Sequence, residues 1–194
     1  MRRLIIAVDC DDVLVRTSPF FVDAYNQKYG TNVTLDRAHD NDDVWGVDRP
    51  TLEARLADLM ETDGYKELSP AEDEIKVLKR LSKLHELHVI TARRPHEREL
   101  TQLMLDAYLP GVFVSLELVG FTGSKGEVTE RLHADVLVDD NLRHLEDAIR
   151  HGLPREGAIL FGDYAWNTSA TTDLARSNTW DEVEKEIERY GRSV

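Results

Sequence analysis

Four carboxylates directly follow two apolar runs of the sequence, where their chemistry could be shared. Asp9 and Asp11 come after one run near the N-terminus, and Asp139 with Asp140 come after another. Several carboxylates held close together could not all stay ionised without a cation. Hard oxygen ligands suit Mg²⁺, so we expect Mg²⁺ as the cofactor, with these four residues as its candidate ligands. A carboxylate can also attack phosphorus to form an aspartyl phosphate.

Three further residues have types that suit a phosphate group. Thr91 ends an apolar run and is followed by Ala92, and Lys125 lies in the turn after another run. Cleavage of a phosphate monoester requires a nucleophile, a proton donor for the leaving oxygen and positive charge around the phosphoryl oxygens. Lys125 would neutralise the nucleophile and a phosphoryl oxygen. The Thr91 hydroxyl and the Ala92 amide could donate hydrogen bonds to the phosphate.

The elements that must position these residues alternate between strands and helices. Apolar runs predict strands over 4–8, 87–90, 112–119, 136–138 and 158–161. Apolar stripes and turn residues predict helices over about 18–30, 51–60, 70–84, 95–107, 126–132, 142–149 and 180–190. This order predicts an α/β fold with a Rossmann-like, doubly wound parallel sheet. Ligands bind at the carboxyl ends of such strands, so we expect the polar residues to meet at one edge of the sheet.

Taken together, the motifs resemble those of the haloacid dehalogenase-like hydrolase superfamily. The resemblance rests on Val8-Asp9-Cys10-Asp11-Asp12-Val13-Leu14, Val89-Ile90-Thr91-Ala92-Arg93, Lys125 and Val138-Asp139-Asp140. It implies that Asp9 attacks phosphorus and that Asp11 protonates the leaving group and then activates water. It also implies that the Asp9 carboxylate, the Asp11 backbone carbonyl and the Asp139 carboxylate hold magnesium, with Asp140 acting through water.

Within this superfamily the chain is similar to the 5'(3')-deoxyribonucleotidase-like group. The supporting residues are Val44-Trp45-Gly46, Trp166-Asn167, Arg176 and Asn178-Thr179-Trp180. This similarity implies a nucleotide as the substrate, in the form of a (deoxy)ribonucleoside 5'-monophosphate. Asp12 is a departure, because nucleotidases of this group often have Gly there, and it places an acidic side chain beside the nucleophile.

The stretch 17–75 predicts no strand and is expected to form a helical insertion after the first strand. In the resemblance it corresponds to a small helical cap that closes over the substrate, leaving 1–16 and 76–194 as the hydrolase core. Phe21, Trp45 and Arg93 are candidates for contact with the substrate. Packing between cap helices is the alternative for the two aromatic residues, and a solvated position is the alternative for Arg93.

The composition limits the protein classes to which the chain could belong. Of the 194 residues 41% are hydrophobic, which suffices for a packed core, and the single Cys10 can form no internal disulfide. A net charge of −13 argues against binding of polymeric nucleic acid. The opening apolar run is too short for a signal peptide or a membrane span. We therefore expect a cytoplasmic protein with no membrane partner, and the oligomeric state is open, with a homodimer among the options.

Two other functions compete with a nucleotidase. The first is a phosphatase acting on sugar phosphates or other small metabolites, which would differ mainly in its cap residues. The second is a non-catalytic module that binds phosphate esters, although such a module has no need of Asp11. Asp140 also has a structural alternative, as the N-cap of the helix that begins near Leu142.

Overall fold

The computed structural model describes residues 2–40, 42–168 and 172–194. Within these residues a parallel sheet of six strands has the order β3-β2-β1-β4-β5-β6. The strands are β1 Ile5–Val8, β2 Glu86–Thr91, β3 Ser115–Leu118, β4 Val136–Asp139, β5 Ala158–Phe161 and β6 Ala175–Ser177. The α/β fold with a doubly wound parallel sheet is thus confirmed.

Helices connect and cover the strands. They are α1 Thr17–Tyr29, α2 Arg49–Met60, α3 Asp63–Lys66, α4 Glu72–Leu84, α5 Arg98–Tyr108, α6 Lys125–Leu132, α7 Leu142–Arg150, α8 Ala165–Thr168 and α9 Trp180–Ser193. Short 3-10 turns occupy Asp42–Trp45, Pro95–Glu97 and Arg155–Gly157. No helix in the described part of the chain is both long and apolar enough to cross a membrane.

The side chains of the central strand alternate between two hydrophobic cores. Ile6 and Val8 belong to the core formed with α4, α5 and α9, whereas Ala7 belongs to the core formed with α6 and α7. Helices therefore cover both faces of the sheet, which explains why β1, β4 and β5 are nearly continuous apolar runs instead of alternating ones.

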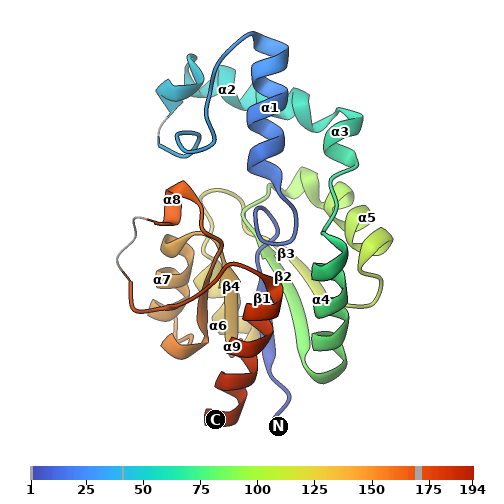
Figure 1. Ribbon diagram of the computed structural model, residues 1–194, viewed down its shortest axis with the longest axis vertical. Coiled ribbons are helices and arrows are strands. Elements are labelled where there is room, and N and C mark those ends of the chain that lie inside the picture. The colour runs from blue at the N-terminus through green and yellow to red at the C-terminus, as the bar shows by residue number, and fades with distance from the viewer. Residues whose placement is uncertain (1, 41, 169–171) are drawn as a thin grey trace.

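A separate group of helices lies beyond the carboxyl edge of the sheet. Figure 1 shows α1, α2 and α3 together at this end of the molecule, above the strands. They have a hydrophobic cluster of their own, formed by Val22, Tyr25, Val33, Trp45, Leu52 and Leu59. We call residues 17–66, which contain these helices, the cap helices. They stand over the strand ends where the site was expected.

Several details differ from the sequence prediction. The strand β6 was missed, because Ala175–Ser177 has no apolar run and is recognisable only by its pairing with β5. The third strand is shorter than predicted, and the helix expected from about residue 70 begins at Glu72. The helix expected over about 18–30 begins at Thr17, so Ser18 lies within the first turn of α1 and does not cap it.

The carboxylate of Asp12 satisfies the first turn of α1 instead. Its Oδ1 accepts a hydrogen bond from the Ser18 amide at 3.1 Å, and its Oδ2 accepts one from the Ser18 hydroxyl. Asp12 is buried and has a left-handed backbone with φ of 58°, a conformation that Asp adopts more readily than most residues. The acidic residue that departs from the family pattern thus attaches the cap helices to the core.

Asp12→Gly should loosen this attachment without straining the backbone, because Gly adopts positive φ at no steric cost. We expect amide hydrogen exchange in the first turn of α1 to become at least about tenfold faster, since hydrogen bonds to a charged group are lost. The conservative Asp12→Asn retains an acceptor and should exchange nearly as slowly as the wild type. Equal rates in the glycine variant and the wild type would contradict this role.

Candidate active site

The carboxyl edge of the sheet brings the predicted polar residues together. Asp9 follows β1, Asp139 ends β4 and Asp140 follows it. Thr91 ends β2, and Lys125 is the first residue of α6, which comes after β3. Because β1 pairs with both β2 and β4, the ends of these strands are neighbours.

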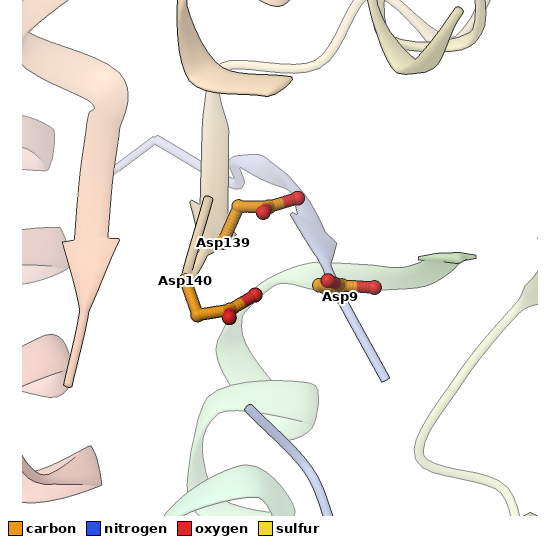
Figure 2. A group of neighbouring side chains, drawn as sticks. All are labelled: Asp9, Asp139 and Asp140. Carbon is orange, nitrogen blue, oxygen red and sulfur yellow. The ribbon is translucent and has the colours of Figure 1, made fainter. Parts of the chain in front are cut away.

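Three buried carboxylates face a common space at this edge. Oxygen atoms of Asp9, Asp139 and Asp140 all lie within 4.8 Å of one another, and Figure 2 shows the three side chains at the ends of neighbouring strands. Burial raises the pKa of Asp9 to about 7, and it raises the pKa of Asp140 well above its usual value. Burial thus favours the protonated forms as long as the charges stay uncompensated.

Lys125 supplies part of that compensation. Its ammonium is fully buried, and Nζ lies 2.7 Å from Asp9 Oδ1 and 2.7 Å from Asp139 Oδ2. Burial alone would lower the pKa of Lys125, but the two carboxylates outweigh it and hold the pKa above its usual value. Three carboxylates and one ammonium leave two negative charges, so an all-oxygen donor set with this charge fits one divalent cation.

The start of α6 fixes the position of Lys125. Ser124 caps the helix by accepting a hydrogen bond from the Glu127 amide, as expected for this residue. Asp147 of α7 accepts hydrogen bonds from the Ser124 hydroxyl at 2.7 Å and from the Gly126 amide at 2.9 Å. A Cβ at Gly126 would lie 2.6 Å from the backbone oxygen of Asp147, so only glycine lets α6 pack this closely on α7.

Asp11 is held in a different way from the three clustered carboxylates. Arg93 donates two hydrogen bonds to it from one edge of the guanidinium, with Nη2 2.7 Å from Oδ1 and Nε 3.0 Å from Oδ2. Burial raises the pKa of Asp11, but the Arg93 charge and hydrogen bonds outweigh this and leave the pKa below its usual value. Arg93 is only 6% exposed and also donates to the Thr101 hydroxyl at 2.9 Å. The solvated alternative for Arg93 is therefore wrong.

Thr91 and Ala92 lie beside this pair. Thr91 is fully buried, its hydroxyl accepts a hydrogen bond from the Arg93 amide at 3.2 Å, and it lies 3.5 Å from Asp11 Oδ2. Ala92 lines the cavity described next. Both residues are thus within the region where a phosphate could be held.

A cavity of about 510 Å³ separates the cap helices from the strand ends. Asp9, Asp11 and Asp140 line it, and so do all three candidates for substrate contact, Phe21, Trp45 and Arg93. Trp45 also packs between the cap helices, which was the alternative to substrate contact. It is 7% exposed, and its indole N–H donates a hydrogen bond to the Ala38 carbonyl at 3.2 Å.

Several residues of this cavity were not predicted from the sequence, namely Tyr65, Phe121, Asn141 and His144. None of them belongs to a motif, and each reaches the cavity only through the tertiary arrangement. The N-cap alternative for Asp140 is wrong, because Asn141 caps α7 through the Arg143 amide. The Asp140 carboxylate instead accepts a hydrogen bond from the Trp166 indole at 2.7 Å.

Comparisons with solved structures support the fold. A structure described as a predicted phosphatase from Clostridium acetobutylicum has a TM-score of 0.69 at 15% identity, covering 97% of this chain and 100% of the other. A haloacid dehalogenase-like protein of unknown function from Agrobacterium tumefaciens has a TM-score of 0.71 at 13% identity, covering 98% and 100%. A haloacid dehalogenase-like hydrolase from Streptococcus pneumoniae has a TM-score of 0.65 at 12% identity, covering 97% and 98%.

The comparison with curated proteins finds no significant match. A family model does match, over residues 3–191, and its description is 5' nucleotidase, deoxy (pyrimidine), cytosolic type C protein. The match covers almost the whole chain, including all the site residues described above. The chain therefore belongs to this 5'-nucleotidase family of haloacid dehalogenase-like phosphoric monoester hydrolases.

Proposed function

We propose that this protein hydrolyses nucleoside 5'-monophosphates through an aspartyl phosphate formed on Asp9, with Mg²⁺ as the cofactor and the cytoplasm as its location. One observation carries the proposal: the buried ammonium of Lys125 lies between Asp9 and Asp139, beside a third carboxylate. This arrangement compensates part of the negative charge around a nucleophile and leaves a charge that fits a divalent cation.

The two oxygens of Asp9 have different surroundings. Oδ1 accepts a hydrogen bond from the Cys10 amide at 2.7 Å and contacts Lys125 at 2.7 Å. Among the residues that the structure describes, none donates a hydrogen bond to Oδ2. We therefore assign Oδ2 as the atom that attacks phosphorus, while Oδ1 is fixed by its two partners.

Asp9, Asp139 and Asp140 would hold the cation with their carboxylates, together with the backbone carbonyl of Asp11. When bound, Mg²⁺ supplies positive charge for the phosphoryl oxygens. Lys125 adds a second positive charge, and the Thr91 hydroxyl and the Ala92 amide donate hydrogen bonds to the phosphate. All of these groups reach the transferring phosphoryl from the strand ends.

Asp11 is the proposed proton donor to the leaving oxygen and then the base that activates water. It lines the cavity, and its carboxylate is not part of the cation cluster of Asp9, Asp139 and Asp140. Arg93 holds this carboxylate in one orientation through two parallel hydrogen bonds, a geometry that lysine cannot reproduce.

The cavity supports a leaving group larger than a simple alcohol. Its volume of about 510 Å³ and its lining by Phe21, Trp45 and Tyr65 provide room and aromatic surface beyond the phosphate position. A nucleoside fits this combination better than a small sugar does, because a base offers a flat face to aromatic rings. We also propose 17–75 as the cap, with 1–16 and 76–194 as the core, supported by the separate hydrophobic cluster of the cap helices.

Asp9→Asn tests the mechanism. The amide cannot form the acyl phosphate and binds a cation less well, so phosphate release should fall by more than about 10³-fold. EDTA should abolish the wild-type activity, and excess Mg²⁺ should restore it. Circular dichroism and the melting temperature provide the control for folding. Substantial turnover by a well-folded Asp9→Asn variant, or activity that is insensitive to EDTA, would contradict the proposal.

Arg93→Met tests whether Arg93 orients the proton donor. We expect kcat/KM to fall about 10²-fold for a nucleoside monophosphate, whose alkoxide needs a proton as it leaves. For p-nitrophenyl phosphate the loss should be several times smaller, because nitrophenolate leaves without protonation. The quantity kcat/KM is chosen because it covers only the steps up to release of the leaving group. An equal loss on both substrates would assign Arg93 to phosphate binding or to folding.

A panel of phosphate esters tests the substrate class. With Mg²⁺ present, kcat/KM should be at least about tenfold higher for nucleoside 5'-monophosphates than for sugar phosphates, a margin of about 1.4 kcal/mol. Deoxyribonucleotides and ribonucleotides are compared in the same series. Equal or better turnover of sugar phosphates would overturn the nucleotide assignment and leave the phosphatase chemistry intact.

A further inference from the structure

Two consecutive residues of α8 hold Asp140 from different sides. The Trp166 indole nitrogen donates to Asp140 Oδ2 at 2.7 Å. The Asn167 side-chain amide donates to the Asp140 backbone oxygen at 3.0 Å. The carboxylate and the peptide of one proposed metal ligand are thus both fixed by a short helix that lies near the end of the chain.

Asn167 is itself fully constrained. It is 1% exposed, and its amide also donates to the Phe161 carbonyl at 2.9 Å. Its side-chain oxygen and its backbone oxygen each accept a hydrogen bond from Arg176, both at 2.9 Å. A buried polar network that is satisfied in this way is rigid, so α8 has a defined position relative to Asp140.

The Trp166 ring stacks with one core residue and one cap residue. The Tyr164 ring has its centroid 4.5 Å away, with the planes inclined by 10°. The ring of His39 from the cap has its centroid 4.0 Å away, with the planes inclined by 27°. Tyr164 donates its hydroxyl to the Asp12 backbone oxygen at 2.6 Å, and His39 Nε2 lies 2.9 Å from the Ser18 hydroxyl.

We propose that Trp166 is a positioning residue that orients the Asp140 carboxylate for the cation and couples the cap to the metal site through His39. The proposal rests on the cation site of the proposed function. Partners that hydrogen-bond to ligating carboxylates orient them, and their loss typically weakens metal binding 10- to 100-fold. Because coupling between two sites is reciprocal, a cap contact that steadies Trp166 also favours cation binding.

Trp166→Phe is the main test, since phenylalanine retains an aromatic ring for both stacks but has no N–H for Asp140. We expect the affinity for Mg²⁺, measured by titration calorimetry of the full-length protein without substrate, to fall about 10- to 100-fold. Trp180→Phe is the matched control, because it removes another indole N–H, which donates to the Val13 carbonyl at 3.2 Å. This control should bind Mg²⁺ as the wild type does.

His39→Ala tests the coupling to the cap. An aromatic stack of this kind contributes enough that its loss should weaken Mg²⁺ binding about two- to tenfold, less than Trp166→Phe does. An unchanged affinity in His39→Ala would overturn the coupling. An unchanged affinity in Trp166→Phe, with normal Mg²⁺ binding by the wild type, would overturn the positioning role alone. Failure of the wild type to bind Mg²⁺ would instead reject the cation site of the proposed function together with this inference.

A double variant distinguishes an effect that acts through Asp140 from a general loss of structure in Trp166→Phe. If Trp166 acts through Asp140, then Trp166→Phe should change the residual Mg²⁺ affinity of Asp140→Asn by less than about twofold, because the two effects are not additive. The same loss in both backgrounds would show that Trp166 acts elsewhere and would overturn the proposal. Melting temperatures of all variants show whether each remains folded.

Discussion

The contact between Lys125 and the carboxylates of Asp9 and Asp139 is the interaction on which the site depends. An ammonium at the first turn of a helix is disfavoured by the helix dipole, and burial disfavours it further. Two carboxylates at 2.7 Å offset both costs. The same contact lets two acidic residues stay close together at the ends of adjacent strands, where their mutual repulsion would otherwise favour protonation.

The parallel sheet makes this contact possible. Residues that are far apart in the sequence become neighbours because β1 lies between β2 and β4, and all three strands end at the same edge. The cap helices then enclose the space above that edge. Enclosure matters for the chemistry, since fixed charges act more strongly where water is excluded. Asp12 belongs to both parts, because it directly follows Asp11 of the core and holds the first turn of α1.

The sequence was sufficient for the parts of the site that follow directly from strand order. Asp9, Thr91 and Asp139 each come immediately after or at the end of an apolar run, so their meeting point follows from the architecture. The burial of Arg93 was not predicted, because an arginine beside a second arginine is usually solvated. Its burial depends on the pairing with Asp11.

Other features could not be predicted because they depend on contacts between distant segments. Asp140 was a reasonable N-cap by its position before α7, but Asn141 has this function, and the carboxylate bonds to Trp166. The strand β6 has no apolar pattern of its own. In the sequence Trp166 and Asn167 contribute only to the family resemblance, because their contacts with Asp140 depend on the position of α8.

The absence of a side chain at Gly126 has a consequence for the position of Lys125. Even alanine at this position would place its methyl group 2.6 Å from the Asp147 carbonyl and 2.4 Å from the His151 ring. Relief of that overlap would move the start of α6 outward, together with the neighbouring lysine. The position of the buried Lys125 ammonium therefore depends on the lack of a side chain at the adjacent residue.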